Sequence, residues 1–431
     1  MTKEIKSVAV LGGGTMGAGI AGLCAERDIK VLILEINQDA VDAAKDRLLN
    51  GIPSPIDNPE KMANIETGTF DKDLEKLKNY DWICEAIIEN AEAKRGLIKR
   101  VEEVRSDHTI LTSNTSGILL KEISEGMPDR LKRNLAVTHF FNPVKAMKLL
   151  EIIPGSDTDQ ETIETLDHFC TQTLGKGVVI AKDTISFIAN RIGCFFMFIG
   201  LHKGKEALDK GLNQERVDAI LSTPIGLPST GLYSLYDLIG LDVMEMIGKN
   251  FAANLPEEDM GKQYGEFPEA EKEMIENGQF GRKTGGGFFR MTKNDDGSRN
   301  KETYDLITKS WRPQLKEELA INDISILFDD SPDGVLAWDV YGTTLCYAAN
   351  LVPVIADDII SVDRAMQWGF NWSNGPFKAM DNIGPHKIIN KLEKEGIELP
   401  HMLKVLKENN AESFYNNNNQ QLSSEGNWIS I

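Results

Sequence analysis

Short apolar runs alternate with longer segments of helical spacing in the first part of the chain. Residues 7–11 (SVAVL) and 30–34 (KVLIL) have the continuous apolar character of strands that are buried on both faces. The residues between them, 16–26, are small and apolar, as in a helix packed closely on a sheet. Further strand-like runs occur at 81–88, 109–112, 135–139, 149–153 and 178–180. This alternation predicts an α/β fold, a doubly wound parallel sheet over residues 1–183.

Long helices are predicted beyond residue 183. The longest apolar run, residues 185–201, contains an Asn and an Arg and is short for a bilayer span, so it predicts a buried or interface helix. A Val-Asp pair followed at nearly equal spacing by Asp-x-Ile-Gly occurs at 217–240 and again at 362–384, which indicates two diverged helical modules. We expect the first at 184–295, a connector at 296–330, the second at 331–400 and a polar tail or linker at 401–431.

Composition and charge narrow the function. The 431 residues are 41% hydrophobic and 26% charged, which excludes a mainly disordered, collagen-like or disulfide-stapled chain. A net charge of −19 argues against nucleic acid or anionic lipid as a partner, so an anionic ligand would need a local positive pocket or a helix N-terminus. Five cysteines without a CxxC pair and six histidines without metal-ligand spacing indicate buried thiols and no metal site. No targeting segment is apparent ahead of the first strand, and we expect a cytoplasmic location without membrane insertion.

A glycine-rich turn follows the first strand and precedes a helix. In Gly12-Gly13-Gly14-Thr15-Met16-Gly17 the first glycine of the GxGxxG pattern makes a tight turn, the second lets the backbone approach a pyrophosphate, and the third lets the helix pack closely. Glu35, at the end of the second strand, is placed to bind a ribose diol, and its charge would repel a 2′-phosphate. The pattern predicts a Rossmann-type site for NAD.

Four polar side chains are candidates for catalysis. His139 ends one predicted strand and Glu151 lies within the next, where a hairpin-like return would place the carboxylate beside the imidazole. Such a pair can take a hydroxyl proton as hydride leaves. Ser116 follows another strand end, and Asn190 lies in an apolar helix pattern. Each has a structural alternative: a strand-end histidine, a capping serine, and an asparagine bonded only to backbone.

Six ordered segments resemble the 3-hydroxyacyl-CoA dehydrogenase family, and the likeness extends over about residues 6–400. They are GGGTMGAGIA (12–21), EAIIENAEAK (85–94), SNTSGI (113–118), THFFNPVKAMKLLEII (138–153), DTISFIANRI (183–192) and GRKTGGGFF (281–289). Residues 369–384 resemble the second helical module of longer members. Residues 147–180 and 226–230 are most similar to long members that fuse the dehydrogenase to an enoyl-CoA hydratase.

The resemblance implies roles for individual residues. His139 and Glu151 match the catalytic pair, and Ser116 and Asn190 match the residues that hold the substrate oxygen. Positions that contact NAD in the family fall on Glu89, Lys94, Asn142 and Lys283. Two departures are visible: the ribose acid is commonly Asp rather than Glu35, and the proline-rich segment 51–58 is shortened, so coenzyme A contacts cannot be assigned.

The function that this resemblance implies is NAD-dependent oxidation of a (S)-3-hydroxyacyl-CoA thioester in fatty-acid β-oxidation. Two alternatives stay open, a non-catalytic partner-binding subunit of a β-oxidation assembly and a dehydrogenase of a free hydroxy acid. Two partner arrangements also stay open, a homodimer and association with an enoyl-CoA hydratase or thiolase.

Overall fold

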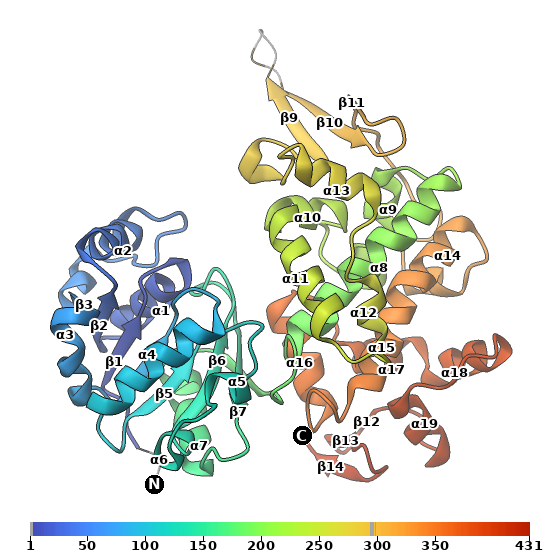
Figure 1. The fold of residues 1–431 in the computed structure, drawn as a ribbon. Helices are drawn as coiled ribbons and strands as arrows, with labels where there is room; N and C mark the ends of the chain where they lie inside the picture. Colours follow the sequence, from blue (N-terminus) through green and yellow to red (C-terminus); the bar gives the residue numbers. More distant parts are fainter. Residues whose placement is uncertain (1–2, 294–296, 298) are drawn as a thin grey trace. The chain divides into compact units, whose positions relative to one another are not determined.

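The computed structural model describes residues 3–293, 297 and 299–431, and the chain divides into two compact units (Figure 1). The first unit comprises the residues up to Ile188 together with 354–357, and the second comprises 189–353 and 358–431. The predicted boundary between the first helical module and the connector, at 295/296, lies outside the described residues. Among the described residues, no helix combines the length and apolar character that crossing a bilayer requires.

An eight-stranded sheet forms the centre of the first unit, in the order β3-β2-β1-β4-β5-β6-β7-β8. The pairs are parallel except β6 with β7, which run antiparallel. The strands are β1 (Ser7–Leu11), β2 (Lys30–Glu35), β3 (Ile65–Thr69), β4 (Trp82–Glu85), β5 (Ile110–Ser113), β6 (Leu135–Phe140), β7 (Leu149–Pro154) and β8 (Gly177–Ile180). The predicted α/β fold with a largely parallel sheet is therefore confirmed.

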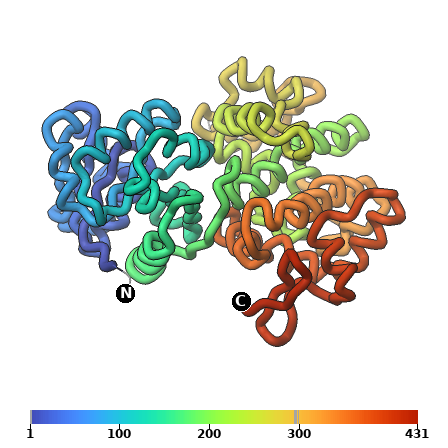
Figure 2. The backbone as a smooth tube through the Cα atoms, turned by 60° about the horizontal axis from the view of Figure 1, so that its bottom comes forward, coloured from blue at the N-terminus to red at the C-terminus, as the bar shows by residue number. Residues whose placement is uncertain are grey.

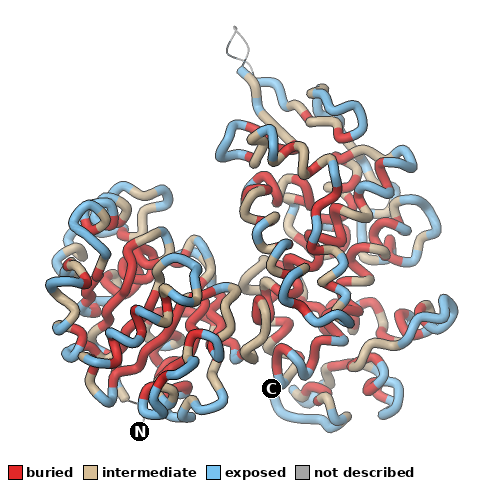
Figure 3. Tube along the Cα trace, in the orientation of Figure 1, coloured by how far each residue is buried: buried red, intermediate tan, exposed pale blue. Residues whose placement is uncertain are grey.

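Buried apolar strands and small helix residues make the core of this unit (Figure 3). Trp82 on β4 stacks on Phe140 and meets Phe169 edge to face. Helix α1 packs closely on the segment at Pro55 because Gly22 has no side chain. A Cβ at Gly22 would lie only 2.6 Å from the Cβ of Pro55. The helices are α1 (Thr15–Glu26), α2 (Gln38–Asn50), α3 (Phe70–Asp73), α4 (Ala91–Val104), α5 (Leu120–Ile123), α6 (Asp129–Lys132) and α7 (Gln160–His168).

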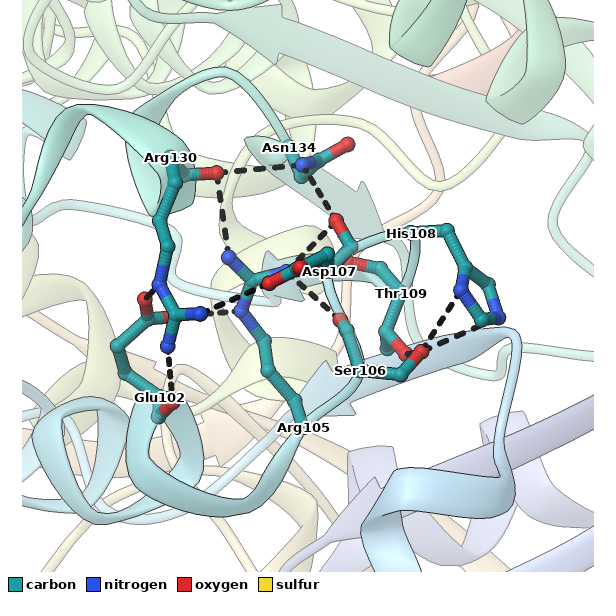
Figure 4. A network of polar contacts seen from close by, with 8 residues as sticks. All are labelled: Glu102, Arg105, Ser106, Asp107, His108, Thr109, Arg130 and Asn134. Carbon is teal, nitrogen blue, oxygen red and sulfur yellow. Dashed lines mark hydrogen bonds and ion pairs between the residues drawn. The ribbon is translucent and has the colours of Figure 1, made fainter.

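An arginine network in which Arg105 and Glu102 are buried joins the end of α4 to the beginning of β5 (Figure 4). The Arg105 guanidinium donates to Glu102 and to the Thr109 carbonyl at 3.1 Å, and Arg130 also pairs with Glu102. The remaining acceptors of Arg105 are the carbonyls of Ser106, Asp107 and Arg130. This paired network fixes the amino end of β5, the strand whose other end leads to Ser116.

The second unit is mainly helical, and its centre is the apolar helix α8 (Ala189–Asp209), as residues 185–201 predicted. The other helices are α9 (Gln214–Ile220), α10 (Tyr233–Ile239), α11 (Leu241–Asn254), α12 (Met260–Tyr264), α13 (Glu269–Glu276), α14 (Pro332–Ala337), α15 (Thr343–Leu351), α16 (Ile359–Gly369), α17 (Pro376–Ile383), α18 (Pro385–Lys394) and α19 (His401–Glu408). Strands β9 (Phe289–Lys293), β10 (Arg299–Asp305) and β11 (Ser310–Pro313) form one small sheet, partly within the predicted connector.

The same aspartate arrangement occurs in both helical modules. Asp237 accepts hydrogen bonds from the amides of Phe288 and Phe289, and Asp381 accepts them from the amides of Phe414 and Tyr415. In each case the aspartate of Asp-x-Ile-Gly holds the chain where a small sheet begins. The internal repeat read from the sequence therefore has a counterpart in the hydrogen bonding.

Residues 401–431 are not the tail that their polarity suggested. They form α19 and the sheet of β12 (Tyr415–Asn416), β13 (Gln420–Leu422) and β14 (Trp428–Ser430), which belong to the second unit (Figure 2). Phe414 and Leu422 are buried, and Phe377 meets Phe414 edge to face. A few buried apolar residues thus order a segment that is otherwise rich in Asn and Gln.

Candidate active site

The glycine turn has the geometry of a phosphate-binding loop. Gly12 has φ +97°, which glycine adopts readily, and a Cβ at Gly17 would lie 1.8 Å from the Gly12 carbonyl oxygen. By contrast, a Cβ at Gly14 would meet no described atom within 4 Å. Helix α1 begins at Thr15 without a side-chain cap, so its first amides are available to an anion beside Gly14.

Glu35 lies next to this loop at the end of β2. Its Oε1 accepts a hydrogen bond from the Gly13 amide at 2.6 Å, and Arg47 Nη1 donates to the Gly13 carbonyl at 2.7 Å. The carboxylate is therefore fixed where the sequence placed the ribose acid. The guanidinium of Arg47 thereby holds the loop backbone at Gly13. The residues present fit NAD.

Gly14→Ala tests this loop. We expect NADH affinity to fall by about tenfold or more, because the added methyl group fills space that the pyrophosphate approaches. Folding should be unaffected, since no described atom beyond the chain neighbours of Gly14 lies within 4 Å of the added methyl group. Fluorescence titration with NADH and thermal unfolding measure the two effects.

Gly17→Ala is the matched comparison, because its methyl group would collide with the Gly12 backbone and lower the unfolding temperature. Wild-type NADH affinity in Gly14→Ala would contradict the assigned phosphate position.

His139 and Glu151 form a buried pair across β6 and β7. The two residues are register partners in the antiparallel ladder, and His139 Nδ1 lies 2.6 Å from Glu151 Oε2. The exposed fractions are 4% for His139 and 0% for Glu151. The contact that the hairpin-like return predicted is present. Because Glu151 engages Nδ1, Nε2 is the ring nitrogen left to exchange a proton with a ligand.

Two aromatic side chains fix the imidazole further. The ring centroids of Phe141 and Phe187 lie 4.5 and 5.5 Å from that of His139. Ser186 and Phe187 both have positive φ, 62° and 52°, a conformation that is costly for residues other than glycine. The turn brings the Ile188 amide within 3.1 Å of Glu151 Oε1. Local backbone strain thus accompanies the contacts that hold the pair.

Ser116 lies in an exposed loop whose backbone is held by Glu89. Glu89 Oε1 accepts hydrogen bonds from Thr115 Oγ1 at 2.6 Å, the Ser116 amide at 2.9 Å and the Gly117 amide at 3.1 Å. Burial works to raise the pKa of Glu89, but the Lys94 charge and these hydrogen bonds outweigh it and lower the pKa below its usual value. The anionic carboxylate keeps the Ser116 loop in place.

Lys94 is buried between two carboxylates. Its Nζ lies 2.7 Å from Glu85 Oε1 and 3.3 Å from Glu89 Oε2, and the exposed fractions of Lys94 and Glu85 are 1% and 0%. Glu85 Oε2 also accepts from Ser113 Oγ at 2.5 Å. The structure therefore places Lys94 in a structural ion pair, and its direct contact with NAD stays a prediction.

The remaining predicted residues lie in three places. Asn142 follows β6 and lines a cavity of about 470 Å³ together with Thr15, at the end of the sheet where the glycine turn lies. Asn190 is the second residue of α8, half-buried, in the second unit. Lys283, also in the second unit, is exposed and pairs with Asp242 at 2.5 Å. The other predicted site residues therefore belong to the first unit, whereas Asn190 and Lys283 belong to the helical second unit.

Sequence reasoning missed several residues that support the site. Glu85 is a carboxylate in an apolar strand, so the rule that singled out Glu151 applies to it equally. Asn114 accepts a hydrogen bond from the Phe140 amide at 2.9 Å and so ties the Ser116 loop to the end of β6. The contact of Phe187 with His139 depends on the positive φ values, for which the sequence has no signal because neither residue is glycine.

Comparisons with known proteins show which family the chain matches. Residues 7–184 match the family model described as "3-hydroxyacyl-CoA dehydrogenase, NAD binding domain", and residues 187–291 match "3-hydroxyacyl-CoA dehydrogenase, C-terminal domain". A Bacillus subtilis protein described as "Probable 3-hydroxyacyl-CoA dehydrogenase" is 35% identical, covering 96% of this chain and 56% of its own length. A Deinococcus radiodurans protein of the same description is 35% identical, covering 68% of this chain and 84% of its own length.

Among solved structures, the 3-hydroxybutyryl-CoA dehydrogenase from Escherichia coli K12 has a similar fold. Its TM-score is 0.68 at 24% identity, covering 93% of this chain and 98% of that one. The chain spans little more than half the length of several curated relatives that it matches, at 56% and 57%.

Proposed function

Because the chain belongs to the 3-hydroxyacyl-CoA dehydrogenase family of NAD-dependent oxidoreductases, we propose that it oxidises a (S)-3-hydroxyacyl-CoA to the 3-ketoacyl-CoA in fatty-acid β-oxidation. The observation that supports this most directly is the buried pair of His139 and Glu151 on adjacent strands, with Nδ1 and Oε2 2.6 Å apart. NAD, when bound, supplies the hydride acceptor.

His139 is the proposed general base. Its Nε2 takes the proton of the C3 hydroxyl while the C3 hydride leaves and the carbonyl forms, so the oxygen carries no full negative charge. Glu151 stabilises the imidazolium that results, and the bond to Nδ1 fixes the tautomer in which Nε2 begins as an acceptor. The aromatic rings of Phe141 and Phe187 hold the imidazole plane during this transfer.

Ser116 and Asn190 are proposed to hold the C3 oxygen. Ser116 has an exposed side chain on a loop that Glu89 orders through backbone amides, so its hydroxyl can serve a ligand. The sequence motif assigns Asn190 the same task. Donors aimed at a developing carbonyl each contribute on the order of 10²-fold to the rate.

The direct test is oxidation of NADH by the purified chain with acetoacetyl-CoA, followed by absorbance. We expect saturable turnover with the thioester and much weaker turnover with free acetoacetate. A preference for the free acid would favour a hydroxy-acid dehydrogenase. No NADH oxidation at micromolar enzyme, with NADH binding intact, would favour a partner-binding subunit and contradict the proposal.

A further inference from the structure

A second, polar cavity lies in the first unit, apart from the His139–Glu151 pair. Its volume is about 260 Å³, and its lining includes Arg27, Lys145, Lys148 and Lys176. Two acidic residues, Glu26 and Asp57, also line it. Four cations thus line one small cavity of a chain whose net charge is −19.

The two acids are already engaged. Glu26 Oε1 accepts hydrogen bonds from the amides of Asp57 and Asn58 at 2.8 and 3.0 Å, and Asp57 pairs with Lys145. Within the described part of the chain, neither Arg27 nor Lys176 has a carboxylate at ion-pair distance. The local balance is therefore positive.

Lys176 is the buried member of this group, with 5% of its surface exposed. Its ammonium donates to two neutral acceptors, the carbonyls of Val144 and Met147. The pKa of Lys176 is lowered to about 8, chiefly by burial and to a smaller extent by the charge of Arg27. A buried ammonium that has only neutral acceptors is stabilised when an anion approaches it.

The cationic cavity adjoins the larger cavity beside the glycine turn, because both are lined by Lys145 and Ala146. The larger cavity is lined by Thr15 and Asn142 near the glycine turn and by the apolar side chains of Pro53, Pro55 and Val144. An elongated ligand could therefore lie against apolar side chains and end among the cations.

We propose that the cavity of Arg27, Lys145, Lys148 and Lys176 binds a phosphate group. The choice of the coenzyme A end of the thioester as the source of that phosphate rests on the proposed function; free phosphate is the other source. The phosphate site itself follows from the charges and the cavity alone.

The site is tested by calorimetric titration of the full chain, saturated with NADH so that the dinucleotide site is filled. Adenosine 3′,5′-bisphosphate and inorganic phosphate are the two probes. We expect saturable binding of at least one probe and a weakening of about five- to tenfold in Arg27→Gln and in Lys145→Gln. Arg133→Gln, at an exposed arginine after α6, is the matched control and should bind as wild type does. No saturable binding, or equal affinities in Arg27→Gln and Arg133→Gln, would overturn the phosphate site.

Kinetics distinguish the two sources. If coenzyme A supplies the phosphate, Arg27→Gln raises KM for acetoacetyl-CoA by about five- to tenfold, the factor by which it weakens probe binding, and leaves kcat unchanged. The KM for the N-acetylcysteamine thioester, which has no phosphate, stays as in wild type. An unchanged KM for both thioesters, with Arg27-dependent phosphate binding, would reject coenzyme A and identify free phosphate as the occupant. Because calorimetry does not depend on turnover, failure of the proposed reaction leaves this test intact.

Discussion

His139→Gln is expected to lower kcat by about 10²- to 10⁴-fold while NADH still binds with wild-type affinity. Glutamine can keep a hydrogen bond to Glu151, but it cannot take a proton from the substrate hydroxyl. The imidazole is almost fully buried against Phe141 and Phe187, so the change is confined to the pair and its ligand. Steady-state turnover and fluorescence titration with NADH measure the two quantities.

Glu151→Gln is the matched variant for the same pair. It keeps the base but removes the charge that stabilises the imidazolium, so kcat should fall by a smaller factor than in His139→Gln. A cofactor-site defect would instead weaken NADH binding in both variants. If His139→Gln kept near-wild-type kcat, the assignment of the base would be wrong.

The pair could be anticipated because two physical rules converge on it. A carboxylate in the apolar run LLEII is costly to bury without a partner, and a strand that returns antiparallel places that partner directly opposite. The prediction rested on a carboxylate within an apolar strand, Glu151, and on a partner at the end of the neighbouring strand, His139. Glu85 is likewise a carboxylate in an apolar strand, WICE. Its partner differs in origin, because Lys94 comes from the following helix, nine residues later, rather than from a neighbouring strand.

Other features were hidden from the sequence for identifiable reasons. Strand β3, IETGT, is an edge strand with polar residues and one glycine, so it has none of the continuous apolar character by which the central strands were found. The polar composition of 401–431 outweighed a few apolar residues, among them Phe414 and Leu422, which are sufficient to anchor a small sheet. The four cations of the cationic cavity come from three separate segments, which pattern reasoning along the chain does not bring together.

Lys94→Met is expected to lower the free energy of unfolding by about 3–5 kcal/mol, because it leaves Glu85 buried without a counter-charge. The double variant Glu85→Gln/Lys94→Met should be more stable than Lys94→Met alone, since it removes the uncompensated charge. Arg95→Met, one residue along the same helix, is the control: its partner Glu125 is exposed, and the loss should stay below about 1 kcal/mol. Urea unfolding of the three variants measures these differences.

The same ion pair connects stability to the proposed catalysis. Lys94 lies 3.3 Å from Glu89, whose other oxygen holds the amides of Ser116 and Gly117. In Lys94→Met the pKa of Glu89 should rise because burial then opposes ionisation with one charge fewer to balance it. Protonated Glu89 accepts hydrogen bonds from these amides more weakly, so the Ser116 loop should loosen as the pH falls. The loss of kcat relative to wild type should therefore be larger at low pH than at neutral pH. A Lys94→Met enzyme as stable as Arg95→Met, with a wild-type pH profile, would show that the buried pair orders neither the fold nor the loop.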